Sequence, residues 1–581
     1  MAIYYIKSNG GTGSGLSDDD AWTFEKLKAT TLAAGDTILF KRGHIFYGAF
    51  STYSGVVGSP TTYGAYGTGE NPIITGLTEL TSWTLESGNI YYATLDVPRL
   101  NMVLLDDVVQ GMGRYPNIGY LQYTGSTGNT SISGTTVGAI PFDPIGGEVV
   151  IRKYRWILDR HPITSRSSNV LNYSAANEYG NNSNYNPVNN NGYFIQNHLS
   201  TVTEEGEWYY DTTLNRLYMH FGAGNPTGRI VRIASIDKNI VSNSKNYVNF
   251  SNLTLEGANL VGLEIGYTGN INVTNCKIIN QGGDAIYGIQ GSGFVAIDNI
   301  IVDKALNNGI LGEFECGNWT VNNCTVTNIS QIAGMGKSGD GAGNGISVNG
   351  NTIVIDYNTV TNSGYNGIAT SSSDSVEINN NIVDTFCTIK DDGAGIYEYD
   401  SVNVNIDSNK VYNAVGAYAG SEAYFWEAYG KAAGIYIDGF LSANVVITNN
   451  YVENGEWGGL FINSSPFIVE AYGNTFRDFA KGIHVYIATG QTVDELNIHN
   501  NRILKSREYA LYIENRVSYD VGSIGVFDVN VYNINSGTEA IYVSNTFSGG
   551  VSRPMTLKQW QSDFGLDLNS FSNPKIMIKS N

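Results

Sequence analysis

The 581-residue chain is poor in charge, proline and cysteine. Charged residues make up 15% of it, and its 12 prolines stand against 69 glycines and 39 tyrosines. This composition is typical of a turn-rich protein built mainly from β-strands. No run of about 18 apolar residues is present, so the sequence predicts no membrane-spanning helix. The four cysteines form no CxxC pair and are too sparse for a disulfide scaffold.

The chain also lacks clusters of lysine and arginine. Its net charge of −20 repels phosphate backbones and anionic lipids, so nucleic acids and membrane surfaces are not expected partners. The first residues, MAIYYIKSNGG, lack the basic and apolar regions of a signal peptide. We expect either a secreted, extracellular protein whose leader is absent from this sequence, or a protein carried on a phage virion.

A repeat between residues 270 and 515 organises the chain. An asparagine-rich turn is followed by apolar residues, a loop, and a strand that begins with a small residue, as in AGIYEY, AGIYID and GGLFIN. Most repeats are 23 to 28 residues long and contain no helical pattern. Aligning the turns places these residues in register: Cys276, Asn299, Cys324, Asn358, Asn381, Asn409, Asn450, Asn474 and Asn501.

This period predicts an all-β fold, a parallel β-helix whose coils stack about 4.8 Å apart. We expect the aligned asparagines to adopt left-handed backbone angles and to bond between coils. A helix at about 22–33 and a strand at 37–40 should cap the first coil. The predicted regions are an N-terminal cap with the first coils (1–111), an inserted β-rich subdomain (112–230), the β-helix with its catalytic loops (231–547) and a C-terminal cover (548–581).

Several segments carry a family resemblance. AGDTILFKRG, MGRYPN, GEWYYD and the asparagine-laddered GI strands resemble right-handed parallel β-helix proteins of the pectate-lyase-like superfamily. That superfamily includes glycoside hydrolases, polysaccharide lyases, epimerases and phage tailspikes, so the resemblance implies a carbohydrate-active protein. The pair Asp391 and Asp392 resembles the paired aspartates of polygalacturonase-like hydrolases, which implies a catalytic role for both.

Three corner loops are longer than the others. They are NISQIAGMGKSGDGAG, DTFCTIKDDGAG and AVGAYAGSEAYFWEAYGKAAG, and all three arise at the same corner of the repeat. Because loops carry chemistry while strands hold them in place, we expect these loops to wall a cleft on one flank. They supply candidate catalytic and substrate-binding residues: Asp340, Asp391, Asp392, Lys337, Lys390, Lys431, Trp426 and Glu427.

The strands beneath the loops predict an outward aromatic strip. Residues two positions after the small residue should face outward, and this series includes Tyr397, Tyr436, Phe461, His484, Tyr512 and Tyr542. Aromatic rings suit the apolar faces of sugars, so Tyr397, Tyr436 and His484 are candidate substrate-binding residues. Asp438 should also face outward. Glu398 falls at an inward position, where it predicts either a bulge or a strained functional site.

These residues favour a glycoside hydrolase acting on a polysaccharide. Asp392 and Asp438 lie one coil apart, about 5 Å along the axis, and are the preferred catalytic pair, assisted by Asp391 or Asp340. Two alternatives remain open. One is a polysaccharide lyase that uses a lysine base and Ca²⁺ held by Asp340, Asp391 and Asp392. The other is a glycan-binding tailspike or adhesin without chemistry. No other cofactor is expected.

Overall fold

The computed structural model describes residues 1–175, 185–267, 269–427, 429–463, 468–488, 495–516, 521–534, 539–545 and 552–572, except for the side chains of 425–427. The chain forms two compact units. The first comprises Met1–Leu311, Thr327–Asn344 and Tyr418–Ala428. The second comprises Gly312–Val326, Gly345–Ala417 and Tyr429–Asn581. Strands β32 (Ile310–Asn322) and β33 (Thr325–Ile329) contain residues of both units.

The first unit contains the earliest coils of the solenoid, whose strands pair in parallel. One run of strands is β1 (Ile3–Gly11), β2 (Thr37–Lys41), β5 (Thr61–Tyr66), β24 (Asn246–Ser251), β27 (Gly269–Thr274) and β30 (Val295–Asp298). A second run is β4 (Phe50–Ser51), β23 (Lys238–Asn243), β26 (Val261–Gly266) and β29 (Asp284–Gly288). The third is β3 (Ile45–Tyr47), β6 (Ile73–Thr75), β25 (Thr254–Glu256), β28 (Lys277–Gln281) and β31 (Ile301–Ala305).

Antiparallel sheets interrupt these coils, as the failure of the repeat predicts, and they begin already at β7. One sheet contains β7 (Leu77–Leu80), β22 (Val231–Ala234), β10 (Val103–Leu105) and β11 (Val108–Val109). Another contains β8 (Thr84–Ser87), β9 (Ile90–Thr94), β21 (Arg216–His220) and β20 (Trp208–Asp211). The largest contains β12 (Arg114–Tyr115), β13 (Leu121–Gln122), β14 (Gly125–Thr127), β15 (Ser131–Ser133), β16 (Glu148–Tyr154), β17 (Ile157–Ser167), β18 (Val170–Tyr173) and β19 (Gly192–Gln196), with the short helix α2 (Thr135–Gly138) beside it.

The N-terminal helix is shorter than the sequence pattern predicts. Helix α1 spans Phe24–Lys28, with Thr23 as its N-cap, and the chain leaves the helix before Thr30. Two consecutive β-branched residues, Thr30 and Thr31, follow, and these disfavour a helix. Strand β1 precedes the predicted first strand and pairs with it in parallel.

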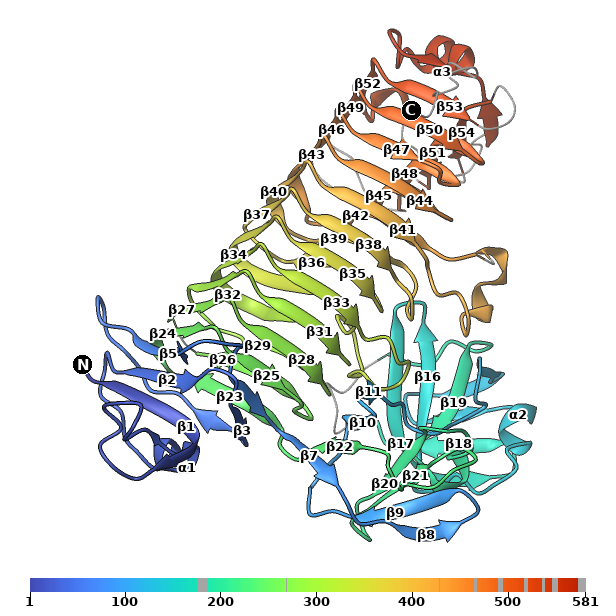
Figure 1. Cartoon of the computed structure of the whole chain (residues 1–581). Coiled ribbons are helices and arrows are strands. Elements are labelled where there is room, and N and C mark those ends of the chain that lie inside the picture. Colours follow the sequence, from blue (N-terminus) through green and yellow to red (C-terminus); the bar gives the residue numbers. More distant parts are fainter. Residues whose placement is uncertain are drawn as a thin grey trace. The chain divides into compact units, whose positions relative to one another are not determined.

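The second unit consists of three parallel runs of strands that form a solenoid (Figure 1). The first is β34 (Ile346–Asp356), β37 (Ser375–Asn379), β40 (Val402–Asp407), β43 (Ala443–Thr448), β46 (Ile468–Tyr472), β49 (Glu495–His499) and β52 (Gly525–Asp528). The second is β36 (Ile368–Ser371), β39 (Gly393–Tyr399), β42 (Ala432–Asp438), β45 (Gly458–Asn463), β48 (Lys481–Ile487), β51 (Tyr509–Asn515) and β54 (Ile541–Asn545), and β55 (Arg553–Met555) joins it antiparallel. The third is β35 (Thr359–Ser363), β38 (Ile382–Phe386), β41 (Lys410–Ala414), β44 (Tyr451–Gly455), β47 (Thr475–Arg477), β50 (Arg502–Ser506), β53 (Val531–Ile534) and β56 (Phe571–Ser572).

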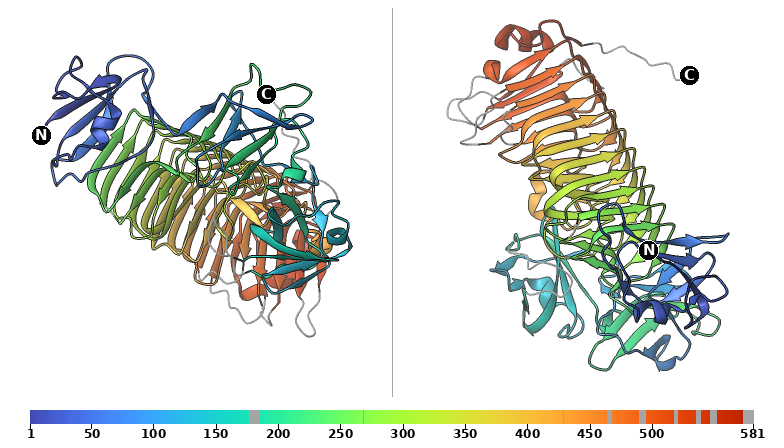
Figure 2. Two further views of the ribbon diagram at one scale, coloured as in Figure 1. Left: turned by 90° about the horizontal axis from the view of Figure 1, so that it is seen from below. Right: turned by 90° about the vertical axis from the view of Figure 1, so that its left-hand side faces the viewer.

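Inward apolar residues form continuous stacks along the parallel strands of this unit. Figure 2 shows the ribbon of these strands from two further sides. One stack consists of buried residues that pair from coil to coil: Val376, Val404, Val445, Val469 and Leu496. No single coil could enclose these side chains, so each coil depends on its neighbours for its core.

The predicted asparagine ladder is present in the second unit. The side-chain oxygen of Asn409 accepts from the backbone N–H of Asn381 at 2.9 Å and from its side-chain amide at 3.0 Å. The Asn409 amide in turn donates to Asn450 at 3.0 Å and to the carbonyl of Ile378 at 2.7 Å. The same arrangement recurs at these buried positions: Asn358, Asn381, Asn409, Asn450, Asn474 and Asn501.

Two details of the predicted ladder were wrong. Lys277 pairs with Ile301, so the position equivalent to Cys276 is Ile300 rather than Asn299. The left-handed backbone angle also falls on the residue before the ladder position, such as Asn380, whose φ is 58°, before Asn381. The ladder asparagine is therefore free to aim its amide along the stack.

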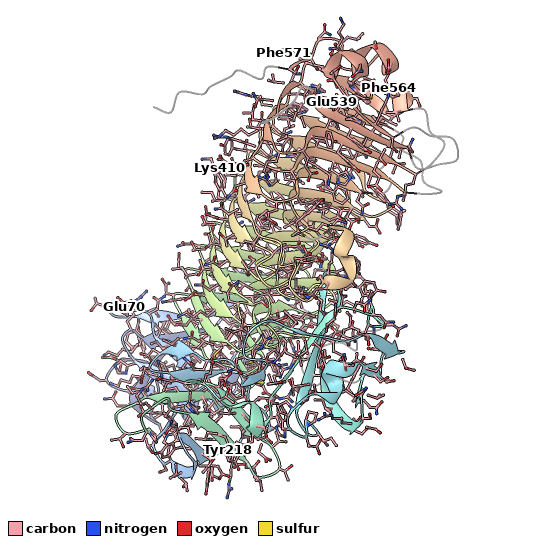
Figure 3. The ribbon with its side chains drawn as sticks, turned by 90° about the vertical axis from the view of Figure 1, so that its right-hand side faces the viewer. Glu70, Tyr218, Lys410, Glu539, Phe564 and Phe571 are labelled. Carbon is pink, nitrogen blue, oxygen red and sulfur yellow. The ribbon has the colours of Figure 1, made fainter. Side chains whose placement is uncertain are left out.

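A C-terminal helix packs on the last coil. Helix α3 (Leu557–Phe564) begins with a capping box between Thr556 and Gln559, and it carries Phe564, labelled in Figure 3. Its fully buried Trp560 lies 6.0 Å from the ring of Phe527 and donates to Asp567 at 2.8 Å. Among the residues described, none of the helices has the length and apolar character needed to span a bilayer.

Replacing Asn409 with Ala should destabilise the second unit. The substitution leaves two N–H donors of Asn381 and the carbonyl of Ile378 without partners in a buried site. Such groups cost about 1–3 kcal/mol each, so we expect a loss of roughly 3 kcal/mol or more. The half-buried Asn497, whose side-chain amide donates to Glu495 at 3.0 Å, supplies the control Asn497→Ala. Equal midpoints of thermal unfolding for the two variants would contradict this account.

Candidate active site

Asp438, the last residue of β42, is a half-buried residue on the aromatic face. One oxygen accepts from the Tyr397 hydroxyl at 2.8 Å. The other accepts from the Asn463 amide and from the backbone N–H of Gly439, both at 2.8 Å. Burial raises the pKa of Asp438 above that of an ordinary aspartate, although these hydrogen bonds oppose the shift. Asp438 is therefore suited to hold and deliver a proton.

The rings of the aromatic strip are in the predicted register. Tyr397, Tyr436, Phe461, His484, Tyr512 and Tyr542 pair across consecutive coils. The middle of the strip is buried, however, since Tyr436, Phe461 and His484 are only 5%, 4% and 6% exposed. The prediction of an open aromatic surface therefore holds only for its two ends, at Tyr397 and at Tyr512 with Tyr542.

Trp457, which the sequence analysis missed, covers this strip. It precedes the small residue of its repeat, outside the aligned strand, and its ring is fully buried. The ring centroid lies 4.4 Å from Phe461 and 6.2 Å from Tyr436. The Lys431 ammonium lies 5.0 Å from the centroid of Trp457, so this predicted substrate-binding lysine joins the aromatic cluster.

The pair Asp391 and Asp392 differs sharply in environment. Asp391 is fully buried, and one of its oxygens accepts from the backbone N–H groups of Lys431 at 2.5 Å and Asp392 at 2.9 Å. It thereby ties two coils together. Asp392 is half-buried, and its carbonyl accepts from the Tyr365 hydroxyl at 2.9 Å. The Lys390 ammonium is buried 5.3 Å from the centroid of Tyr365.

The predicted catalytic pairing of Asp392 with Asp438 joins residues at opposite ends of a strand pair. The residues do lie one coil apart, but Gly393 pairs with Ala432, and Tyr399 pairs with Asp438. Asp392 therefore lies just before the first residue pair of strands β39 and β42, whereas Asp438 belongs to their last residue pair. At about 3.3 Å per residue their backbones are on the order of 20 Å apart. Tyr436 lies between them: burial raises its pKa most, and the charges of Asp438 and Asp392 add to the effect.

A different carboxylate lies beside Asp438. Asp400 follows Tyr399, and one of its oxygens accepts from the backbone N–H of Phe440 at 2.6 Å and of Leu441 at 2.8 Å. Asp438 accepts from the preceding N–H of the same turn, that of Gly439. Consecutive backbone nitrogens are about 3 Å apart, so the bonded oxygens of Asp400 and Asp438 lie within about 9 Å of each other. Both residues are half-buried.

Glu398 faces the interior of the solenoid and has no access to a substrate. It is fully buried, no bulge interrupts the pairing of its strand, and its carboxyl group accepts from the backbone N–H of Ser401 at 2.5 Å. Burial raises its pKa to about 8, so it is protonated at neutral pH. The prediction of a catalytic role for Glu398 is wrong, because a sealed interior group cannot touch a glycan.

The loop that contains Lys337 and Asp340 belongs to the first unit, where it packs against the inserted strands. The backbone N–H of Gly339 donates to Asp159 at 2.7 Å, and Gln196 donates to the carbonyl of Gly334 at 2.8 Å. Residues 418–424 of the third long loop also belong to this unit, and Gly192 donates to Gly420 at 2.8 Å. These loop segments are therefore held by the inserted subdomain rather than standing free.

Their candidate residues have partners within the first unit. The Lys337 ammonium forms an ion pair with the buried Asp284 at 2.5 Å, a partner the sequence analysis missed. The exposed Asp340 accepts from the Tyr185 hydroxyl at 3.2 Å. The side chains of Trp426 and Glu427 lie outside the described residues.

The calcium alternative finds no assembled ligand set in the part of the chain that the structure describes. No three side chains of His, Cys, Asp or Glu there are grouped as metal ligands. Asp340 belongs to the first unit, whereas Asp391 and Asp392 belong to the second.

Comparisons with known proteins agree with the strand pairing. A family model described as the right handed beta helix region matches residues 222–383 and, in an overlapping alignment, 308–495. The solenoid is a right-handed parallel β-helix. A search of the curated proteins finds no match.

Three solved structures share similarity with this β-helix chain. A glycoside hydrolase is 10% identical, with 99% of this chain and 97% of that chain covered at a TM-score of 0.49. XylC in complex with xylose is 12% identical, with 99% and 87% covered and a TM-score of 0.39. A GH136 lacto-N-biosidase from Eubacterium ramulus is 12% identical, with 98% and 68% covered and a TM-score of 0.36.

Replacing Glu398 with Gln should stabilise the protein at alkaline pH. The folded protein keeps the Glu398 proton up to a pH of about 8, whereas the unfolded chain releases it near the ordinary glutamate pKa. The folded state binds more protons in this window, so the stability of the wild type falls as the pH rises through it.

The thermal midpoints of Glu398→Gln and wild type should converge near pH 5 and separate in favour of the variant by pH 8 to 9, as read by calorimetry. Glu377→Gln, on β37, controls for the loss of one glutamate. Parallel pH curves for Glu398→Gln and wild type, or loss of turnover in this variant, would refute the interior role.

Proposed function

We propose that the protein cleaves glycosidic bonds in a polysaccharide as a glycoside hydrolase, with Asp438 as its general acid. The observation that carries this proposal is the half-buried Asp438, whose pKa is raised by burial and whose carboxyl group accepts from the hydroxyl of the half-buried Tyr397. A carboxyl group of raised pKa beside an aromatic ring suits both the leaving oxygen and the apolar face of a sugar.

Asp400 serves as the second carboxylate in this proposal. It lies within about 9 Å of Asp438, a range that includes the spacings of both retaining and inverting glycosidases. Asp438 gives its proton to the glycosidic oxygen as the bond to the anomeric carbon breaks. Asp400 accepts the proton of the attacking water, or bonds the anomeric carbon before water releases it. Phe440 and Leu441, 49% and 60% exposed, extend the apolar surface beside this pair.

The lysine positions give less support to elimination chemistry. A general base must be neutral and within reach of the substrate proton. Lys337 is held in an ion pair with Asp284, and Lys390 is buried against Tyr365. The hydrolase proposal therefore uses groups better matched to their task than the lyase alternative does.

Asp438→Asn and Asp400→Asn should each lower turnover by about 100-fold or more while the protein remains folded, because each removes one partner of the proton transfer. Wild-type activity should fall as the pH rises through the raised pKa of Asp438, since the acid must be protonated, and Asp438→Asn should lose this limb.

Activity is measured on a glycan panel as new reducing ends and as ultraviolet absorbance of unsaturated products, with and without chelator. Asp384→Asn, on the separate sheet of β38, is the matched control, and Asp392→Asn tests the pairing of Asp392 with Asp438. Ultraviolet absorbance that disappears when chelator is added would contradict hydrolysis and would indicate elimination. Binding without any turnover would leave a glycan-binding protein.

A further inference from the structure

The far end of the aromatic strip contains a buried histidine surrounded by rings. His484 lies on β48 and is 6% exposed. Its ring centroid is 4.6 Å from Phe461, 4.9 Å from Tyr512 and 5.7 Å from Trp457. Such an apolar enclosure usually holds an apolar side chain, so a polar ring at its centre calls for a reason.

Both ring nitrogens of His484 lack a hydrogen-bond partner among the described residues. The nearest carboxylate oxygen, of Glu514, is 3.8 Å from Nε2, beyond hydrogen-bond distance. Desolvation lowers the pKa of His484 to about 4, so the ring is neutral and offers one N–H donor and one acceptor. Both groups are buried and unsatisfied among the residues that the structure describes.

Two ammonium groups flank this histidine. Lys481, on the same strand, lies 4.8 Å from the centroid of Tyr512 and donates to the Tyr429 hydroxyl at 3.2 Å. Lys431 lies over Trp457, and the charges of both lysines help to keep His484 neutral. Rings that hold a cation against their faces present that cation at the edge of an apolar surface.

The positive charge of Lys481 is only weakly compensated. The Lys481 side chain is 8% exposed, and its ion-pair partner Glu508 is 3.8 Å away and 45% exposed. Glu514 is engaged by Arg516 at 2.7 Å, so its charge is already matched. In a chain of net charge −20, this cluster is a local positive site, and local charges dominate within a Debye length of about 10 Å.

We propose that Lys481, Lys431 and His484 form a subsite that binds the carboxylate of an acidic sugar residue. The ammonium groups supply charge-assisted hydrogen bonds to the carboxylate, the His484 ring supplies a neutral donor or acceptor, and Tyr512 offers its face to the sugar ring. This inference rests on the proposed function in taking the ligand to be a glycan, and it narrows the substrate to acidic polysaccharides.

Binding is measured by calorimetry on the full-length Asp438→Asn variant, so that cleavage does not intervene. The probes are galacturonate and glucuronate oligosaccharides, the same oligosaccharides with each carboxyl reduced to a hydroxymethyl group, and a sulfated oligosaccharide. We expect the two uronate probes to bind at least about tenfold more tightly than their reduced forms, with a preference that weakens as salt increases. The sulfated probe shows whether the subsite accepts any anion or prefers a planar carboxylate.

Adding Lys481→Met or His484→Phe should weaken uronate binding by about tenfold and leave the reduced probes unaffected, since both changes keep the apolar volume. Lys410→Met is the matched control, because Lys410 is an exposed lysine on β41 (Figure 3). Thermal midpoints confirm that each variant folds.

The inference is overturned if no uronate probe binds, if reduced probes bind equally well, or if Lys410→Met has the effect of Lys481→Met. Cleavage of a neutral glycan by wild type, unaffected by Lys481→Met, would overturn it while leaving the proposed function intact. Lysine-dependent uronate binding without any cleavage by wild type would support it and remove the proposed function.

Discussion

The buried asparagine ladder is the interaction on which the second unit depends. A parallel solenoid must turn its backbone at the same place in every coil, and each turn leaves polar backbone groups inside the protein. Asn409 shows the solution, since its amide bonds to the backbone of the preceding coil and donates to the ladder asparagine of the following one. A net gain of about 1 kcal/mol per bond is small, but an unmet buried group costs more, so the ladder fixes the register as well as the stability.

That register determines what the solenoid can position. Stacked coils place equivalent residues about 4.8 Å apart, which aligns the rings from Tyr397 to Tyr542. The candidate catalytic groups lie where strands end, because the backbone N–H groups of the turns are free there to bind carboxylates. The turn after β42 engages both Asp438 and Asp400, and it couples their carboxyl groups without a long loop.

The sequence predicts the structural features that repeat in every coil, and it does not predict residues whose position depends on one coil alone. The β-helix, most of the ladder and the aromatic strip follow from the period, and the structure confirms them. Asn299 was misplaced because the motif was aligned on its asparagine rather than on the inward Ile300. Asp392 was paired with Asp438 because only the rise between coils was considered, whereas the distance along the strands is larger. Trp457 and Asp400 lie outside the aligned strand positions, so the period carries no signal for either.

The end of the ladder shows how a repetitive fold acquires a definite length. The ladder position after Asn530 is Ser570, whose hydroxyl accepts from the backbone N–H of Asn530 at 2.7 Å and donates to the carboxyl of Asp567 at 2.5 Å. Asp567 also accepts from the side chains of Asn530, Tyr532 and Trp560. A side-chain amide can continue the ladder because it donates hydrogen bonds to the next coil as well as accepting them from the previous one. A carboxylate only accepts hydrogen bonds, so it ends the ladder. The ladder therefore ends at a hydroxyl and a carboxyl group, and continuing it would require an amide side chain in place of Ser570.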